Sequence, residues 1–187
     1  MNTPDNTSNS PSITSGTHLS YWTNSVEPLR FSPLQNDISA DIVVVGAGIS
    51  GISVAYNLAK SGREVVVLED GYVGSGETGR TTAHLVNALD DFYTYIEKYH
   101  GEEGARLAAL SHTEAINFIE RVTRAEGIAC DFERLDGYLY LHPTDERKTL
   151  EEELDATHRS GINTELLDNT PGLAGVSSVS LHYPNQA

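Results

Sequence analysis

Three glycines and one acidic residue have the types and the spacing needed to bind a dinucleotide. Gly46, Gly48 and Gly51 form a G-x-G-x-x-G pattern, and Glu69 follows Gly51 after 18 positions. In such a pattern Gly46 permits a tight turn, Gly48 lets the backbone approach a pyrophosphate, and Gly51 lets a helix pack closely on a strand. We expect the carboxylate of Glu69 to accept hydrogen bonds from ribose hydroxyls and to repel the 2′-phosphate of NADP. The pattern therefore predicts a dinucleotide site.

The segments around these residues have the order that such a site requires. Residues 42–45 are a β-branched run, which predicts a strand buried on both faces. Residues 48–61 predict a helix, and residues 64–69 predict a second buried strand, so the three segments form a βαβ unit. We expect the first amides of the helix, those of Ile49 and Ser50 among them, to point at the phosphates.

The rest of the chain predicts further helices and antiparallel strands. Residues 90–128 predict two helices that are broken near Gly101. Residues 130–143 alternate between apolar and polar types, which predicts a pair of strands turning at Asp136-Gly137.

Two further segments complete this expected order. We expect Thr144 to cap a helix that ends at Gly161. Residues 179–183 predict a last strand. No internal repeat is visible.

The N-terminal residues differ in composition from the rest. Residues 1–38 predict a flexible tail or arm, because the first 20 positions are rich in Asn, Thr, Ser and Pro. Tyr21 and Trp22 fit either an arm that packs on the body of the protein or isolated surface aromatics.

Composition excludes several classes of partner. The 187 residues carry 27 acidic and 12 basic side chains, a net charge of −15, which disfavours nucleic acid and anionic membranes as partners. Cys130 is the only cysteine, so the chain forms no internal disulfide and no cysteine-based metal cluster, and we expect a reducing cytoplasm. The sequence has no transmembrane-length apolar run and no Lys or Arg before Arg30, so we expect no membrane span and no secretory signal.

Residues 71–85, GYVGSGETGRTTAHL, bear on the choice between NAD and FAD, which the glycine pattern leaves open. In an NAD domain, ordinary βα structure usually follows the acidic residue. Here a loop follows that is rich in glycine and in hydroxyl groups, which are suited to further phosphate and ring contacts. The loop favours FAD, although a surface linker has a similar composition.

Residues 41–85 closely resemble the N-terminal flavin-binding segment of the D-amino-acid-oxidase-like family, which includes glycine and sarcosine oxidases. The stretches GSGETGRTTAHL, GEEGARLA and CDFERLDGYLYL are most similar to bacterial members that append a Rieske iron–sulfur domain. The resemblance extends from about Ser20 to the C-terminus. It implies an α/β fold: a Rossmann-like FAD/NAD(P)-binding domain with a GR2-type βαβ start, followed by helices and antiparallel strands of a partial substrate domain.

The resemblance also implies roles for single residues. In the family, the segment that matches residues 74–82 lies along the pyrophosphate and the ribityl chain of FAD. The cofactor contacts carried over from it are Ser75, Arg80, Thr81 and Thr82. His84 is a weak candidate for the active site, since it could attach flavin covalently, contact the ring or substrate without a bond, or serve in ordinary packing. We expect His112 to be a core histidine and Cys130 to be a small buried hydrophobe.

The implied activity is that of an FAD-dependent oxidoreductase that takes a hydride from a carbon bearing an amine. An amine or amino acid is the expected substrate, and electrons could leave through a Rieske centre in a longer protein. The alternatives are an NAD-dependent dehydrogenase and a non-catalytic dinucleotide-binding fragment.

Family members are longer than this chain. The sequence lacks the late Gly-Asp motif of the family, and one cysteine cannot supply the Rieske ligands. We therefore expect residues 39–187 to be the N-terminal part of an FAD-binding oxidoreductase domain, with the catalytic groups unassigned.

Overall fold

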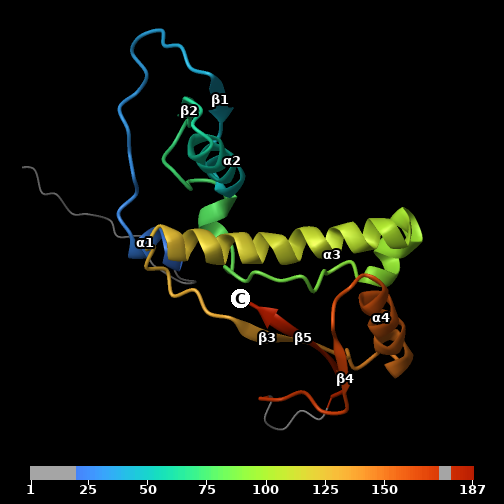
Figure 1. Cartoon of the computed structure of the whole chain (residues 1–187). Coiled ribbons are helices and arrows are strands. Elements are labelled where there is room, and N and C mark those ends of the chain that lie inside the picture. Colours follow the sequence, from blue (N-terminus) through green and yellow to red (C-terminus); the bar gives the residue numbers. More distant parts are fainter. Residues whose placement is uncertain (1–19, 173–177) are drawn as a thin grey trace, which may run out of the picture. The chain divides into compact units, whose positions relative to one another are not determined.

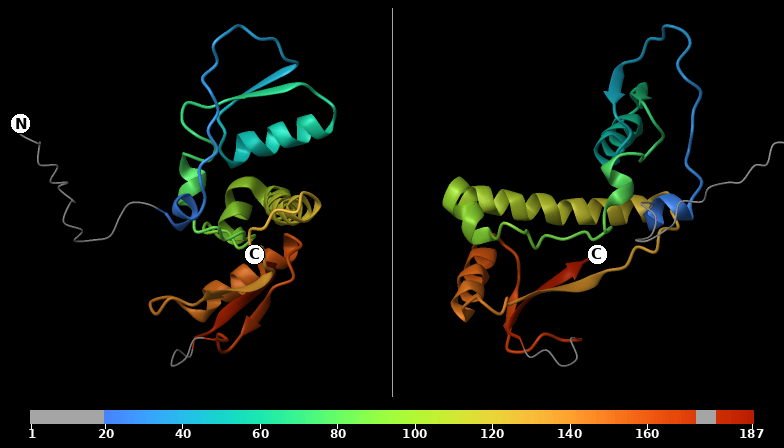
Figure 2. Two further views of the ribbon diagram at one scale, coloured as in Figure 1. Left: turned by 90° about the vertical axis from the view of Figure 1, so that its left-hand side faces the viewer. Right: turned by 180° about the vertical axis from the view of Figure 1, so that it is seen from behind.

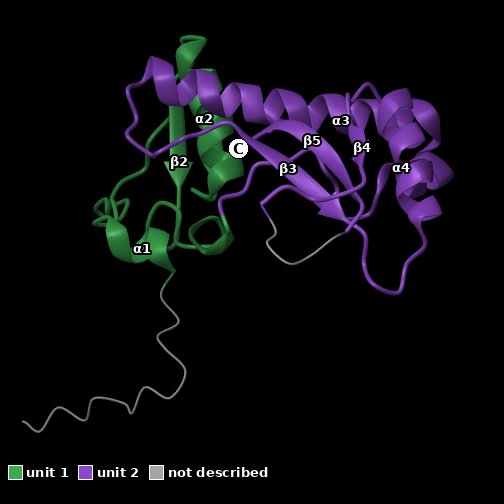
Figure 3. Cartoon of the chain, turned by 90° about the horizontal axis from the view of Figure 1, so that it is seen from below, with its two compact units in different colours: residues 1–82 green, residues 83–187 purple. Residues whose placement is uncertain are grey.

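The computed structural model of the protein describes residues 20–172 and 178–187 (Figure 1). The chain divides into two compact units, residues 1–82 and residues 83–187 (Figure 3). Each unit has its own sheet: the sheet of unit 1 is parallel and that of unit 2 is antiparallel. This confirms the α/β class and the combination of a dinucleotide-type start with antiparallel strands.

Unit 1 contains the expected βαβ arrangement (Figure 2). Strand β1 (Ile42–Val45) pairs in parallel with β2 (Val65–Leu68), and helix α2 (Ile49–Lys60) connects them. The register places Ile42 opposite Val65 and Val45 opposite Leu68. In-register pairing brings the carboxyl ends of both strands to the same edge, where the glycine turn and Glu69 follow.

The expectation that β1 is buried on both faces is wrong for the described residues. Ile42 and Val44 are half-buried on the face that α2 covers, whereas Val43 and Val45 are 54% and 83% exposed. A run of β-branched residues indicates that the segment prefers a strand. It does not show whether other elements cover one face of that strand or both.

A short helix, α1 (Tyr21–Ser25), contacts the loop after β2, at the 3₁₀ turn η1 (Glu77–Arg80). The Ser20 hydroxyl donates to the carbonyl of Gly79, and Trp22 Nε1 donates to the carbonyl of Thr81 over 2.8 Å. For this segment the structure favours the packed arm over isolated surface aromatics. The predicted tail at residues 1–19 lies outside the described residues.

Unit 2 is built on a long helix, α3 (Tyr93–Ala125), and a three-stranded sheet (Figure 1). Gly101 interrupts the helix with φ +72°, which confirms the predicted break. The other elements are β3 (Leu135–Tyr140), α4 (Arg147–Arg159), β4 (Glu165–Leu167) and β5 (Ser180–Gln186), and the strand order is β3-β5-β4. The buried apolar core is formed by Tyr93, Ala105, Ala109, Leu150, Ala156, Ile162, Leu181 and Tyr183.

The predicted turn at Asp136-Gly137 is wrong, because β3 runs straight through both residues. Gly137 pairs with Tyr183 of β5, and the register shifts between Leu135 and Gly137. A Cβ at Gly137 would lie 3.1 Å from Cγ of Gln186. The glycine therefore marks an irregular pairing with a strand that is distant in sequence, and not a local turn.

Thr144 is not the cap of α4. The helix starts at Arg147, preceded by Glu146, and the Thr144 hydroxyl lies 2.8 Å from Nδ1 of His142 in the preceding turn. The predicted stop is close to correct, since α4 ends at Arg159 and Gly161 has φ +87°.

The start of α3 is capped from a distance by a buried carboxylate. Glu153 of α4 is fully buried, and its two oxygens accept the amide N–H groups of Tyr93 and Thr94 over 2.7 and 3.0 Å. The residue before the helix, Phe92, has φ +56° and offers no side-chain cap. Glu153 thus satisfies amides that would otherwise be orphaned and ties α4 to α3.

Replacing Glu153 with Ala should destabilise unit 2 by about 1–3 kcal/mol for each amide left unpaired in the interior. The control is Glu152→Ala, since Glu152 is exposed and forms only a surface pair with Lys148. Chemical denaturation of both variants measures the difference. Equal losses of unfolding free energy would show that Glu153 does not cap α3.

Stability should also depend on pH through Glu153. Burial raises the pKa of Glu153 above its ordinary value of 4.5, although the two amide hydrogen bonds oppose this. A raised folded-state pKa means that the contribution of Glu153 to stability is fully present below about pH 4.5 and is lost as the pH rises through the folded-state pKa. Glu153→Gln should therefore gain stability relative to the wild type as the pH rises over that range, measured as unfolding free energy at several pH values.

Candidate functional site

Glu69 joins the two loops at the end of the parallel sheet. One carboxylate oxygen, Oε2, accepts the amide N–H of Ala47 over 2.6 Å. The other, Oε1, accepts the amide of Gly71 over 3.1 Å and the hydroxyl of Ser75 over 3.3 Å. These bonds, above all that from Ala47, lower the pKa of Glu69 below its ordinary value, so the group is a carboxylate at neutral pH.

The glycine turn has the geometry that its residues predict. Gly46 has φ +97°, and its amide donates to the carbonyl of Leu68 over 2.7 Å. A Cβ at Gly51 would lie 1.9 Å from the carbonyl oxygen of Gly46, which no side chain can tolerate. Gly74 is connected to the same turn, since its amide donates to the carbonyl of Ala47 over 3.0 Å. The turn, Glu69 and the loop after β2 form one hydrogen-bonded cluster.

Thr78 is a residue of this cluster that the sequence analysis missed. Its hydroxyl accepts the amide N–H of Ile49, the first residue of α2, over 2.9 Å. A Cβ on Gly48 would lie 3.2 Å from the same hydroxyl oxygen. The oxygen of Thr78 therefore occupies the acceptor position at the helix start, where an anion would also be held. In the sequence, Thr78 differs from its neighbours only in being a hydroxyl residue within a glycine-rich loop. Residues 71–85 contain four other hydroxyl residues, so this feature could not single out Thr78.

The structure brings some of the predicted cofactor-binding residues together in this cluster and places others elsewhere. The cluster brings together Gly46, Gly48, Ile49, Gly51, Glu69 and Ser75, and Ser50 lies in the first turn of α2.

The remaining predicted contacts have other surroundings. Arg80 pairs with Glu77 over 3.2 Å, and both side chains are exposed. Thr81 accepts the indole N–H of Trp22 through its carbonyl, and Thr82 is exposed. His84 belongs to unit 2, where its side chain is exposed.

Two other expectations in unit 2 are corrected. His112 is exposed on α3, with Nδ1 lying 3.3 Å from the carbonyl of Val86, so it is partnered but is not a core residue. Cys130 is exposed and not buried. Both errors come from assuming that every residue on an apolar stripe or in an alternating segment faces the core.

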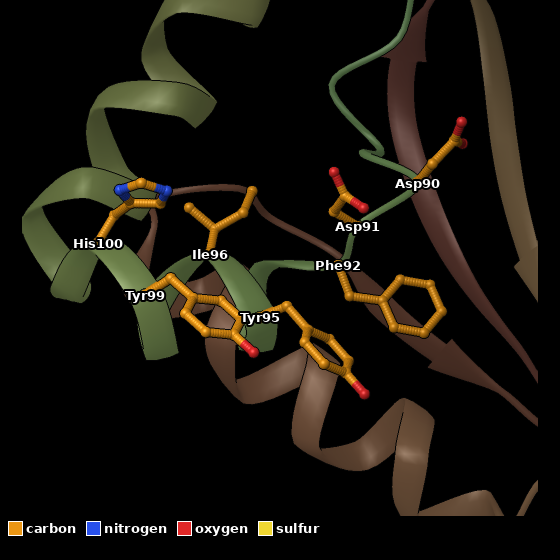
Figure 4. A pocket seen from close by; sticks show the side chains of 7 residues that line it. All are labelled: Asp90, Asp91, Phe92, Tyr95, Ile96, Tyr99 and His100. Atoms are coloured by element: carbon orange, nitrogen blue, oxygen red, sulfur yellow. The ribbon is translucent and has the colours of Figure 1, made fainter.

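A pocket of about 460 Å³ lies at the start of α3, lined by two aspartates, Asp90 and Asp91, and by aromatic residues (Figure 4). Carboxylates and ring faces together suit an organic cation. The ammonium group of Lys98 already stands over the rings of Tyr95 and Tyr99, at 5.8 and 5.3 Å from their centroids. The chain thus provides its own cation for these rings.

The described residues gather no group of three or more His, Cys, Asp or Glu side chains that could hold a metal ion. Nor does this part of the chain include a helix with the length and apolar character needed to cross a membrane.

The comparison with known protein families identifies the chain. Residues 41–187 match the family model described as FAD dependent oxidoreductase. The chain belongs to this family. The sequence-based preference for FAD over NAD is thereby confirmed, as is the resemblance to D-amino-acid-oxidase-like flavoproteins.

Two curated relatives are similar over most of the chain. A Bacillus subtilis protein named as a Rieske 2Fe-2S iron-sulfur protein, YhfW, is 32% identical over 89% of this chain and 33% of its own length. The gamma-glutamylputrescine oxidoreductase of Escherichia coli is 38% identical over 74% of this chain and 32% of its own length. The chain therefore spans about a third of the length of these relatives.

Solved structures show the same fold at lower identity. The L-amino acid deaminase of Proteus myxofaciens superposes with a TM-score of 0.65 at 16% identity, covering 86% of this chain and 35% of the deaminase. The L-proline dehydrogenase of P. horikoshii gives a TM-score of 0.59 at 24% identity, covering 79% of this chain and 37% of the dehydrogenase.

Gly51→Ala should disrupt the strand-to-helix turn, because the new methyl group would overlap the Gly46 carbonyl oxygen. The control is Gly76→Ala in the adjacent loop, where a Cβ meets nothing within 4 Å. We expect Gly51→Ala to lower the melting temperature of unit 1 and to abolish FAD binding, whereas Gly76→Ala should retain both. Normal FAD affinity in Gly51→Ala would contradict the close helix–strand contact.

Proposed function

We propose that the glycine turn, Glu69 and Thr78 hold the adenine half of FAD in a flavoenzyme that oxidises an amine or an amino acid. The observation that carries this proposal is the position of Glu69. Its carboxylate is fixed at the carboxyl end of β2 by three hydrogen bonds, next to a turn in which Gly48, which has no side chain, directly precedes the helix start.

The residues fit a pyrophosphate at the start of α2. The first-turn amides of a helix have no intrahelical acceptor, and the helix dipole adds partial positive charge there. Ile49 and Ser50 would donate these amides to phosphate oxygens, and the bare backbone of Gly48 permits the approach. The Thr78 hydroxyl, which now accepts from Ile49, would turn to donate to the phosphate instead.

Glu69 would bind the ribose through the few hydrogen-bond acceptor positions that its carboxylate has left. A carboxylate offers about four acceptor positions, and three bonds from Ala47, Gly71 and Ser75 leave about one for a ribose hydroxyl. A second hydroxyl would replace Ser75, whose 3.3 Å bond is the longest of the three. We therefore assign Ser75 to positioning Glu69 as well as to the cofactor.

The later loop residues would contact the rest of the cofactor. The pair between Arg80 and Glu77 is exposed and weak, so the guanidinium is available to a phosphate or to the polar edge of the flavin. Thr81 and Thr82 follow it along the same segment. His84 remains a candidate for the flavin ring or for substrate.

The names of the relatives support an amine or amino acid as the substrate. They include gamma-glutamylputrescine oxidoreductase, L-proline dehydrogenase, glycine oxidase and L-amino acid deaminase. Bound flavin supplies acceptance of a hydride, here from the carbon that bears the nitrogen, while the protein binds and orients. The Rieske name of YhfW supports an iron–sulfur centre as the next electron carrier.

Cofactor titration tests this function. The protein should take up FAD, with the absorbance spectrum of a bound flavin, and bind NAD at least about tenfold more weakly. Gly48→Val should lose FAD binding, because the added side chain fills the phosphate approach and presses on Thr78. Tight NAD binding without FAD uptake would overturn the assignment.

Removing the charge of Glu69 should weaken FAD binding by about tenfold or more, because hydrogen bonds to a charged acceptor are stronger than those to a neutral one. The variant is Glu69→Gln. The matched control is Glu64→Gln, because Glu64 is exposed and directly precedes the first residue of β2. Fluorescence titration of FAD measures both. Equal affinities in the two variants would remove Glu69 from the site.

A further inference from the structure

The N-terminal arm, residues 20–30, contacts the end of the loop that follows β2. The hydroxyl of Ser20 donates to the carbonyl of Gly79, and Nε1 of Trp22 donates to the carbonyl of Thr81 over 2.8 Å. Both bonds end on main-chain carbonyls, so they hold the path of the loop backbone and not the position of one side chain.

The arm is ordered for this contact by its own hydrogen bonds. The hydroxyl of Ser20 also accepts the amide N–H of Thr23 over 3.2 Å, so one group caps α1 and binds the loop. Further along the arm, the guanidinium carbon of Arg30 lies 5.1 Å from the centre of the Tyr72 ring, at the start of the same loop. The arm therefore contacts the loop near both of its ends.

Gly79 provides the space for the contact at the end of the loop. The residue is buried, and its φ lies outside the left-handed region, so the backbone conformation does not require a glycine. A Cβ at this position would lie 2.8 Å from Cγ2 of Thr23 and 2.9 Å from the carbonyl oxygen of Gly74. The missing side chain thus lets the arm approach the loop closely.

The same loop is bonded to the glycine turn. The amide of Gly74 donates to the carbonyl of Ala47 over 3.0 Å, and the hydroxyl of Thr78 accepts the amide N–H of Ile49 over 2.9 Å. Thr78 directly precedes Gly79, the residue that the arm binds. A loop that opened at Gly79 would therefore also move the hydroxyl that lies at the start of α2.

We propose that the arm is a strap that keeps this loop closed over bound FAD and slows the dissociation of the cofactor. The inference rests on the proposed function, in which the loop contacts FAD. Opening the loop must break the bonds to Gly79 and Thr81 as well as those to the turn, so the strap lowers the population of the open loop. Ser20 and Trp22 are thus positioning residues that act on the cofactor through the loop.

The rate of FAD release tests the strap in the full chain. Trp22→Phe keeps an aromatic ring but loses the N–H donor, and Ser20→Ala loses the hydroxyl. Each variant should release FAD about fivefold faster than the wild type, the ratio expected for one lost hydrogen bond. The control is Tyr21→Phe, which keeps the ring beside Trp22 and loses only a hydroxyl from a side chain that is 74% exposed. Recovery of flavin fluorescence after dilution measures the four rates.

A second measurement uses the unaltered protein. Trp22 is the only tryptophan of the chain, so its indole N–H gives a single NMR signal of its kind. Coupling between two equilibria is reciprocal, so bound FAD should slow the solvent exchange of this proton by about the same fivefold. An arm that served only the stability of unit 1 would exchange this proton at the same rate with and without FAD.

The outcomes separate the strap from the proposed function. If the wild type takes up FAD but both variants release it at the wild-type rate, the strap is overturned and the proposed function stands. Indole exchange that does not change when FAD binds has the same consequence. If the wild type takes up no FAD, the proposed function fails and the strap fails with it.

Discussion

The arrangement of the loops in unit 1 depends on the hydrogen bonds that the carboxylate of Glu69 accepts. Glu69 ends β2, and its oxygens accept from Ala47 in the glycine turn and from Gly71 and Ser75 in the following loop. These bonds hold the turn and the loop at the same edge of the sheet. Glu69 therefore holds together the backbone segments that form the proposed cofactor site.

Unit 2 uses a carboxylate in a related way, with a different consequence for charge. Glu153 is fully buried and caps α3, and its burial raises the pKa of the group. Glu69 is partly exposed, and the amide donors lower its pKa. The pKa of the same chemical group is thus raised in the core and lowered beside the glycine turn, because desolvation has the larger effect on Glu153 and hydrogen bonding the larger effect on Glu69.

The sequence was sufficient for features whose cause is local. Gly46 and Gly51 form the predicted tight turn and close helix contact through backbone geometry within six residues, and the break at Gly101 follows from a single left-handed residue. Features set by distant partners were not predictable: Gly137 is read as a turn unless β5 is known, and the caps supplied by Glu153 and Thr78 cross 60 and 29 positions. The exposure of His112 and Cys130 was likewise missed, because periodicity does not show what covers a face.

NMR of the backbone amides during FAD addition tests most directly whether the Gly46–Gly51 turn and Glu69 form the cofactor site. The amide signals of Ala47, Ile49 and Gly71 should shift together and saturate, because a phosphate and a ribose would alter their acceptors. Amides of α4 should stay unchanged. FAD binding that leaves the signals of Ala47, Ile49 and Gly71 in place would contradict the account.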